Sequence, residues 1–524
     1  MKTQALAPFL GINNRKPDFS LRVATSTMNG QYLRSADNVD VNNAGKLRRI
    51  DGATRIAAMS NPHSLFADSF VVRSAVLYSI TLPTYAETML KVLTSDAAMS
   101  YVEANGSTYY SNGTDSGRVT SGVVYPLALP TPDSPTISIT TGGLLPGRYQ
   151  VGVSYSNATT GEEGGISASS NIELATTSGI HVVLPAATTG ATHVNIYLSD
   201  ANGSVPKLVT SVVTGTASYD CVALGTGRES NGRFEEPLPA GTLFMSNGRL
   251  CSFSQNTVFV GLPYRHGYYL PASGYIPFPA DVTVAVENQG GTFIVADKTY
   301  FFPGDLGAPK EQVATVLPYG GVVGTAFMMP DRSMCGWFGE KGFVFGATSG
   351  EVEAVMTENV DVVPPVSGFS TVYETNGYRR VMSCGWTVNL ENKAATTYSV
   401  PFTSAFGSYL TRSDGIYQIA AEAPVDAAIG FGKMNFETEA KKSIPAVYLG
   451  IDASDQMMLT VTTPNGTSYE YLARSSSEDL KIQRIDPGKG LLENWFDLAL
   501  TNTNGSAFTM ASISFGAIAS SRRI

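Results

Sequence analysis

Two adjacent glutamates, Glu162 and Glu163, are the first candidates for acid–base chemistry in this sequence. Hydrolysis of a glycosidic bond requires two carboxyl groups about 5 to 9.5 Å apart, one on each side of the bond. Side chains of neighbouring residues at a hairpin tip point away from each other. We therefore interpret this pair as part of a solvated loop and not as a catalytic pair.

Other residue types that could carry catalysis are scattered along the chain. Further carboxylates could meet on one face of a folded domain, although their spacing alone does not show it: Asp297, Asp305, Asp331, Glu340 and Asp361. The four histidines, His63, His181, His193 and His266, are distant from one another in sequence. No nucleophile elbow, phosphate-binding loop or H-E-x-x-H motif is present. We predict that the chain is not an enzyme.

Cysteine spacing argues against a metal or redox motif. Cys221, Cys251, Cys335 and Cys384 form no C-x-x-C pair, so neither a zinc ribbon nor a redox dithiol is supported. Buried thiols in a reducing compartment are the simplest interpretation. We expect no cofactor and no metal.

A short basic cluster near the N-terminus, Lys46, Arg48 and Arg49, could contact phosphates. Asp40 and Asp51 lie beside it, which makes it a weak patch for nucleic acid. We predict that these three residues contact acidic groups of a neighbouring subunit.

Two aromatic clusters, 264–269 and 275–279, could stack on sugars or form a partner interface. Packing within the core is their alternative interpretation.

Charge limits the partners of this protein. Its 35 basic and 44 acidic residues give a net charge of -9. Tight DNA binding requires clustered positive charge, whereas an acidic wall allows DNA to pass without sticking. No apolar run approaches the roughly 18 residues needed to span a bilayer, so we expect no stable membrane insertion.

The elements that would position these residues are strands. Only 15% of residues are charged and 52 are glycine, and apolar residues alternate in short runs such as 70–78, 292–296 and 342–345. Turn dipeptides, including Asn247-Gly248 and Asn376-Gly377, separate such runs. From Gly248 onward they recur every 35 to 50 residues or so, which is close to the length of one propeller blade.

The sequence therefore predicts an all-β fold in five parts. These are an extended N-terminal arm (1–52), the first part of a β-propeller (53–129), an inserted sandwich of the fibronectin III or immunoglobulin type (130–237), the remainder of the propeller (238–404) and a C-terminal, jelly-roll-like β-sandwich (405–524).

Three stretches of the chain resemble a known family. They are Ser35–Asp40 with Gly45–Gly52, then Gly274–Val282 with Thr299–Gly304, and finally Trp495–Leu498 with Asn504–Phe508 and the terminus Arg522-Arg523-Ile524. In these stretches the chain resembles bacteriophage tail proteins of the nozzle or tail-hub kind, which are built on a β-propeller.

The resemblance implies a homo-oligomeric ring, commonly a hexamer, around a channel that conducts DNA. It also implies contacts with other tail proteins (adaptor, tube or fibre), a place in the virion tail, and assembly in the cytoplasm of the bacterial host. The family has no catalytic residues to carry over.

Three functions follow for comparison. The leading hypothesis is a structural virion protein of the tail. The alternative is a receptor- or carbohydrate-binding tail adhesin, favoured by the inserted sandwich and the aromatic clusters. A propeller glycosidase is the third.

Overall fold

The computed structural model describes residues 2–24, 29–67, 69–81, 84–229, 234–308 and 313–520. Nearly all regular structure is β-strand, and within these ranges the one helical element is the 3₁₀ turn η1 (Asp18–Ser20). The all-β prediction is confirmed. No helix in the described ranges has the length and apolarity needed to cross a bilayer.

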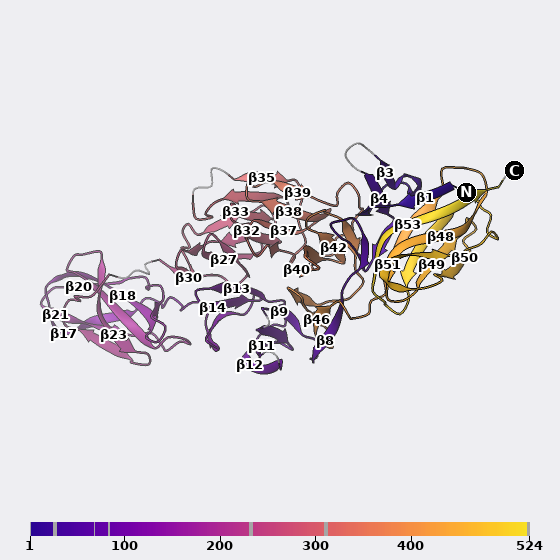
Figure 1. Ribbon diagram of the computed structural model, residues 1–524. Coiled ribbons are helices and arrows are strands. Elements are labelled where there is room, and N and C mark those ends of the chain that lie inside the picture. Colours follow the sequence, from indigo (N-terminus) through magenta and orange to yellow (C-terminus); the bar gives the residue numbers. More distant parts are fainter. Residues whose placement is uncertain are drawn as a thin grey trace. The chain divides into compact units, whose positions relative to one another are not determined.

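The chain forms two compact units, which are described separately. Unit 1 comprises 1–73, 80–87 and 316–524, and unit 2 comprises 74–79 and 88–315. Figure 1 labels the strands of both. Strands in residues 63–92, which are divided between the units, are β9 (His63–Phe66), β10 (Phe70–Arg73), β11 (Val76–Thr81) and β12 (Ala86–Val92).

Unit 2 contains four-stranded antiparallel meanders. The first is β13 (Ser100–Ala104), β14 (Ser107–Ser111), β15 (Ser116–Thr120) and β16 (Val123–Tyr125). The next is β26 (Thr242–Ser246), β27 (Arg249–Ser254), β28 (Thr257–Phe259) and β31 (Tyr275–Pro277). The last is β32 (Val284–Asn288), β33 (Gly291–Val295), β34 (Thr299–Pro303) and β35 (Ala314–Leu317), whose final two residues are assigned to unit 1.

Between the first two meanders, unit 2 carries two sheets that enclose a core of their own. One sheet is β17 (Thr136–Leu144), β21 (Ser178–Val183) and β24 (Ser218–Cys221). The other is β19 (Glu162–Glu163), β18 (Gly147–Asn157), β22 (His193–Ser199) and β23 (Pro206–Val213), with β20 (Ser170–Leu174) beside β18. We call this pair of sheets the inserted sandwich. A small sheet, β25 (Glu236–Pro237), β30 (Arg265–Tyr269) and β29 (Gly261–Leu262), follows it.

Unit 1 contains two further four-stranded sheets. One is β36 (Phe327–Met328), β37 (Met334–Gly339), β38 (Gly342–Ala347) and β39 (Val352–Ala354); the other is β44 (Ser404–Phe406), β45 (Tyr409–Arg412), β46 (Gly415–Ala420) and, from the N-terminal part of the chain, β8 (Gly52–Ala58).

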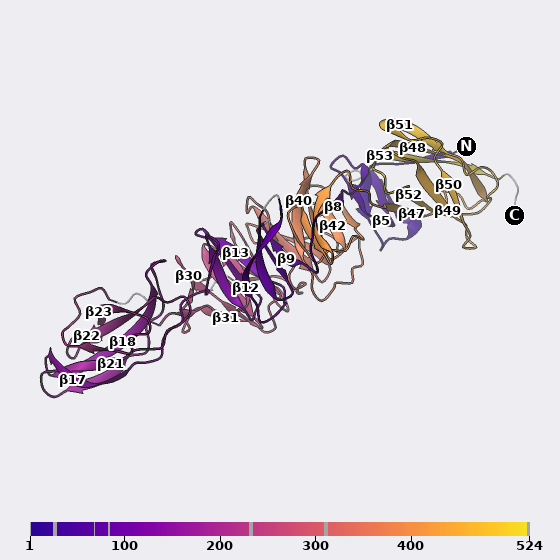
Figure 2. The same ribbon diagram turned by 90° about the horizontal axis from the view of Figure 1, so that it is seen from below.

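Two large sheets and one small sheet complete unit 1. The nine-stranded sheet is β40 (Ser370–Thr375), β41 (Tyr378–Ser383), β42 (Trp386–Asn389), β43 (Ala395–Thr397), β5 (Ser35–Asp37), β47 (Ala428–Met434), β52 (Phe496–Asn502), β49 (Met457–Thr462) and β50 (Ser468–Leu472). The six-stranded sheet is β51 (Ser477–Ile485), β48 (Lys442–Ala453), β53 (Phe508–Ala519), β7 (Leu47–Arg49) and β6 (Val39–Val41), with β1 (Lys2–Leu6) beside β53. The small sheet is β2 (Phe9–Ile12), β4 (Asn29–Leu33) and β3 (Arg22–Ala24). Figure 2 shows β48 and β53 against β47, β49 and β52.

The predicted hairpin turns are confirmed. Asn105-Gly106, Asn247-Gly248 and Asn376-Gly377 join β13 to β14, β26 to β27 and β40 to β41. Both residues of each pair have positive φ, for example 47° and 76° at Asn247 and Gly248, as a type I′ turn requires.

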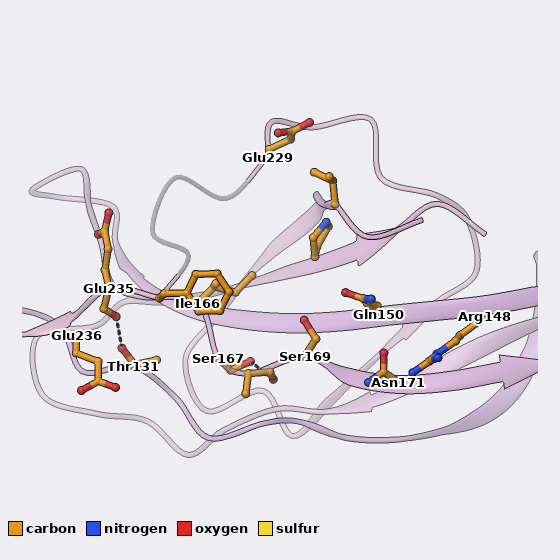
Figure 3. A pocket seen from close by; sticks show the side chains of 14 residues that line it. Thr131, Arg148, Gln150, Ile166, Ser167, Ser169, Asn171, Glu229, Glu235 and Glu236 are labelled. Carbon is orange, nitrogen blue, oxygen red and sulfur yellow. Dashed lines mark hydrogen bonds between the residues drawn. The ribbon is translucent and has the colours of Figure 1, made fainter. Parts of the chain in front are cut away.

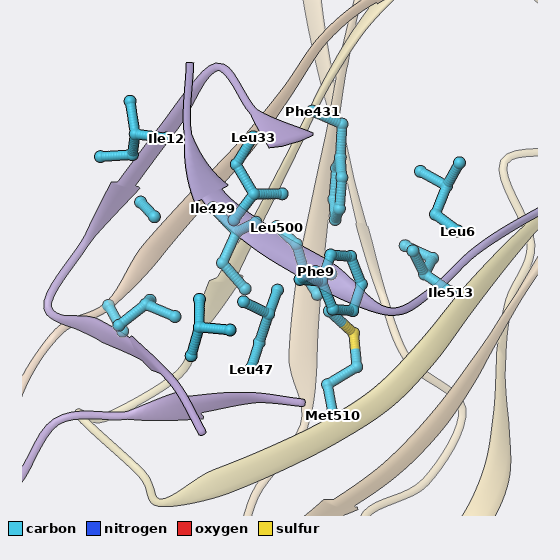
Figure 4. Close-up of a cluster of buried hydrophobic side chains, with 14 of the residues drawn as sticks. Leu6, Phe9, Ile12, Leu33, Leu47, Ile429, Phe431, Leu500, Met510 and Ile513 are labelled. Atoms are coloured by element: carbon cyan, nitrogen blue, oxygen red, sulfur yellow. The ribbon is translucent and has the colours of Figure 1, made fainter. Parts of the chain in front are cut away.

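The N-terminal segment differs from the extended arm that the sequence predicts. β1 pairs with β53, β7 pairs with β53 and β6, and β5 lies between β43 and β47. The segment folds back because its alternate residues are apolar and complete a core. Figure 4 shows Phe9, Leu33 and Leu47 packed with residues from the C-terminal strands.

The ends of the predicted domains also shift. β44 to β46 lie at the start of the predicted C-terminal sandwich, but they belong to a four-stranded sheet that β8, from the N-terminal part of the chain, completes. The Arg522-Arg523-Ile524 terminus lies outside the described residues.

A buried ion pair joins the N-terminal segment to the nine-stranded sheet. Arg380 Nε of β41 lies 2.7 Å from Asp40 Oδ1 of β6, and the two side chains are 0% and 1% exposed. Arg380 also donates hydrogen bonds to Thr387 Oγ1 (3.1 Å) and Thr396 Oγ1 (3.4 Å). Removal of one partner of such a pair leaves a buried charge uncompensated.

We expect Asp40→Ala to lower the free energy of unfolding of unit 1 by about 3 to 5 kcal/mol. Urea unfolding followed by tryptophan fluorescence measures it, because all three tryptophans, Trp337, Trp386 and Trp495, lie in unit 1. Asp414→Ala, which breaks the exposed pair with Arg55, is the matched control and should unfold as the wild type does. Equal curves for the two variants would contradict the assigned role of Asp40.

Candidate functional site

Glu162 and Glu163 lie where the inserted sandwich meets β14 to β16 and β30 in unit 2. β19, the two-residue strand that they form, pairs with the end of β18 at Ser156 and Asn157. Their side chains point in opposite directions, as predicted from adjacency. The predicted solvated loop is wrong, because the two side chains are only 12% and 9% exposed.

Glu162 faces the meander β13–β16 and β30. Its carboxylate pairs with Arg118 of β15. It also accepts hydrogen bonds from the Tyr268 hydroxyl (2.7 Å) and, at 3.3 Å, from the Leu129 amide. Burial raises the pKa of Tyr268 well above its ordinary value, and the charge of Glu162 adds to this shift, so the phenol stays protonated as the donor.

Glu163 faces the sandwich interior. One carboxylate oxygen accepts hydrogen bonds from Ser154 (2.6 Å), Asn195 (2.9 Å) and the hydroxyl of Tyr197. The other accepts a hydrogen bond from Arg228 (2.5 Å). Burial alone would raise the pKa of Glu163, but these four donors outweigh burial and hold the pKa below its ordinary value.

Close backbone packing completes this junction. Arg265 of β30 pairs with Glu235 at 2.5 Å and donates to the Glu163 carbonyl at 2.9 Å. A Cβ atom at Gly165 would lie 2.0 Å from the Glu235 carbonyl oxygen. Only glycine fits there, which explains the Gly164-Gly165 pair after the glutamates.

A cavity of about 450 Å³ opens beside the junction, and its charged groups are already paired. It is lined by Arg118, Glu162, Glu163, Arg228, Tyr264, Arg265, His266 and neighbouring residues. The Tyr264 side chain is 92% exposed. His266 contacts Tyr109 edge-to-face at 5.9 Å, and burial lowers the pKa of His266.

A second cavity, of about 570 Å³, lies on the inserted sandwich. We call it the sandwich pocket (Figure 3). Arg148 and Gln150 of β18 and Asn171 of β20 line it, and Gln150 and Asn171 are direct partners across the two strands. Tyr149 and Val151, which alternate with them, are buried in the sandwich core.

The walls of the sandwich pocket come from the connecting segments. They are Ile166, Ser167, Ala168 and Ser169, then Val205 and Pro206, and residues 229 and 234–236. Thr131 Oγ1 donates to the Glu235 carbonyl at 3.0 Å, which ties the 131 and 235 segments together. Phe234 is 71% exposed and has a φ of 66°, a conformation that an aromatic residue adopts only at a cost in energy.

The other residues singled out in the sequence have local partners. Asp305 is held by Arg249 (2.7 Å), Asp361 by Arg15 (3.5 Å), and Asp297 accepts from Tyr300 (3.2 Å). Asp331 accepts from Ser333, and Glu340 accepts from the Gly320 amide. His181 and His193 lie on strands β21 and β22, beside Asp220 and Thr192, and His63 contacts Ser64.

The predicted subunit-interface residues divide into two groups. Arg48 pairs with Asp51 within the chain. Arg49 donates to the carbonyls of Ala421, Ala423 and Gly505. A contact of Arg48 and Arg49 with a neighbouring subunit stays a prediction; within the chain, folding of the N-terminal segment already engages part of each guanidinium group. Lys46 is half-buried, and its ammonium group has no partner among the described residues.

Cys221, Cys251 and Cys335 are buried and Cys384 is half-buried. Burial raises the pKa of Cys221 and Cys251 to about 12. In the described part of the chain, no group of three or more His, Cys, Asp or Glu side chains is arranged to hold a metal ion.

The chain is similar to some solved structures, but its sequence matches no protein family. No protein-family model matches the chain, and no curated protein does. Among solved structures, it is similar to an exo-β-1,3-galactanase from Phanerochaete chrysosporium (10% identity, 90% of this chain and 100% of that chain, TM-score 0.19). It is also similar to a glycoside hydrolase family 43 arabinoxylan arabinofuranohydrolase from Bacillus subtilis (7% identity, 80% of this chain and 95% of that chain, TM-score 0.22). A computationally designed protein is similar too (9% identity, 66% of this chain and 98% of that chain, TM-score 0.23).

These comparisons overturn the prediction that the chain is not an enzyme, since the galactanase and the arabinofuranohydrolase are enzymes. With TM-scores of 0.19 and 0.22, neither substrate nor activity carries over to this chain.

The low pKa of Glu163 predicts how the junction responds to acid. Because its pKa is lower in the folded chain than the ordinary value of about 4.3, its contribution to stability is present above that pH and is lost as the pH falls through the folded pKa. In the wild type, the backbone amides of β18 and β22 should lose protection from hydrogen exchange below about pH 4. We expect this loss to be smaller in Glu163→Gln. Hydrogen exchange of peptides from these strands measures it.

Glu173→Gln, at an exposed position of β20, is the control and should follow the wild-type pH profile. If Glu163→Gln also follows the wild-type pH profile of hydrogen exchange, Glu163 does not determine how the junction responds to acid.

Proposed function

We propose that this chain is a structural protein of a bacteriophage tail, of the nozzle or hub kind, which assembles with copies of itself into a ring. The observation that supports the proposal is the way in which unit 1 joins its two chain ends. β5 lies between β43 and β47, and β8 completes the sheet of β44 to β46. β5 lies within the N-terminal residues, 35–40 and 45–52, that carry the resemblance to tail proteins, and β8 begins at the last of them, Gly52.

The finer features of the fold belong to the same proposal. We infer that the four-stranded meanders are blades of a β-propeller, because a strand from the N-terminal part of the chain completes the sheet of β44 to β46. The inserted sandwich would be of the fibronectin III or immunoglobulin type, and the sandwich that begins at β47 would be jelly-roll-like. Rigid, fully paired sheets suit a subunit that must keep its shape during ejection.

The partners follow from the resemblance and the charge. The ring would contact adaptor, tube or fibre proteins in the virion tail and would assemble in the cytoplasm of the bacterial host. The net charge of -9 suits transient passage of DNA without tight binding.

Among the three residues predicted at the contact between subunits, Lys46 is the one whose charged group has no partner in the described part of the chain. We expect the purified protein to form a ring of six copies of the 55.5 kDa chain, and Lys46→Glu to shift the population toward smaller species by reversing one contact charge at each interface. Native mass spectrometry at low and high salt measures both.

Lys441→Glu, which changes the charge equally at a different site, is the control and should leave the ring intact. A chain that stays monomeric at high concentration, and that is missing from purified tails, would overturn the proposal.

A second candidate function, a receptor- or carbohydrate-binding tail adhesin, is favoured by the sandwich pocket. It is compatible with the first, because the pocket belongs to the inserted sandwich and the joined chain ends belong to unit 1.

A further inference from the structure

We propose that the sandwich pocket binds a neutral hexose unit of a surface polysaccharide. The inference rests on the second candidate function and specifies its site and its sugar class. The cavity of about 570 Å³ lies within the range of about 300 to 1,000 Å³ that is typical of small-molecule sites.

Unpaired polar side chains carry the argument. Within the described residues, the side chains of Arg148, Gln150 and Asn171 have no hydrogen-bond partner, although all three line the cavity. Only their backbone groups are engaged, as when the Gln150 amide donates to Ser199 Oγ at 2.9 Å. In the cavity beside Glu162 and Glu163, by contrast, each carboxylate is already paired with an arginine.

The geometry of these side chains suits a sugar. Gln150 and Asn171 are cross-strand partners on adjacent strands, so their amides can donate to and accept from neighbouring hydroxyl groups. Arg148, two residues from Gln150 on the same face of β18, adds further donors. Phe234 supplies an exposed aromatic face in the same lining, against which the apolar face of a pyranose ring can pack.

Local charge selects a neutral sugar over an acidic one. Arg148 contributes one positive charge to the lining. Glu229 and Glu236 contribute two negative charges, while Glu235 is already paired with Arg265. A uronic acid carboxylate would therefore meet a net negative lining.

The test uses the full chain with maltotriose, mannotriose, galactotriose and trigalacturonate, and records saturation-transfer NMR and isothermal titration. We expect millimolar binding of at least one neutral trisaccharide and at least tenfold weaker binding of trigalacturonate at low salt. Asn171→Ala and Phe234→Ala should each weaken the neutral ligand about tenfold. Leu145→Ala, at a 67% exposed apolar position of the same sandwich, is the control and should bind as the wild type does.

The results of this test distinguish a wrong binding site from a wrong adhesin function. Binding that survives in both Asn171→Ala and Phe234→Ala would overturn this site and leave carbohydrate binding elsewhere on the chain. Stronger binding of trigalacturonate than of every neutral sugar would overturn the sugar class. No binding of any of the four sugars by the wild type would overturn both the site and the adhesin function, whereas ring formation is measured independently. Unchanged melting temperatures would show that the variants remain folded.

Discussion

The pairing of β5 with both β43 and β47 is the constraint on which unit 1 depends. This three-residue strand makes one sheet out of two sets of strands, β40 to β43 on one side and β47, β52, β49 and β50 on the other. Such a short strand cannot hold its place through backbone hydrogen bonds alone. The buried Asp40–Arg380 pair lies three residues further along the chain and fixes the segment against β41, while Arg49 binds three carbonyls.

The buried Asp40–Arg380 pair contributes more to the correct position of the N-terminal segment than to the free energy of unfolding. A buried ion pair loses hydration on both sides, and apolar residues of similar size often pack as well. Asp40 and Arg380 do, however, leave the N-terminal segment few alternatives, because any shifted register would bury an unpaired charge. The buried apolar residues of the same unit, such as Leu33, Leu47 and Ile429, supply the burial energy (Figure 4).

Sequence patterns predicted what depends on neighbouring residues and failed where distant residues meet. Alternation and Asn-Gly turns correctly predicted an all-β chain and its hairpins, because both are local properties. The N-terminal segment looked like an arm because it is polar and rich in asparagine, yet Asn13 and Asn38 use their amides to bind other segments. Asn389 of β42 in turn donates to the Val41 carbonyl. The exposure assigned to Glu162 and Glu163 failed for the same reason, since Arg118 and Arg228 lie 44 and 65 residues away in sequence. Only the two glycines that follow hinted at a tightly packed junction.

The two cavities of unit 2 show why a carboxylate pair is a poor guide to function in this chain. Glu162 and Glu163 drew attention because of their chemistry, but their oxygens receive hydrogen bonds from arginine, tyrosine, serine and asparagine side chains that belong to the same fold. Groups satisfied in this way hold the sandwich against β30 and have little capacity left for a ligand. Arg148, Gln150 and Asn171 attract no attention in the sequence, because polar residues alternating with apolar ones are ordinary in a strand. Their unpaired side chains around one cavity, and not their residue types, make the sandwich pocket the stronger candidate for binding.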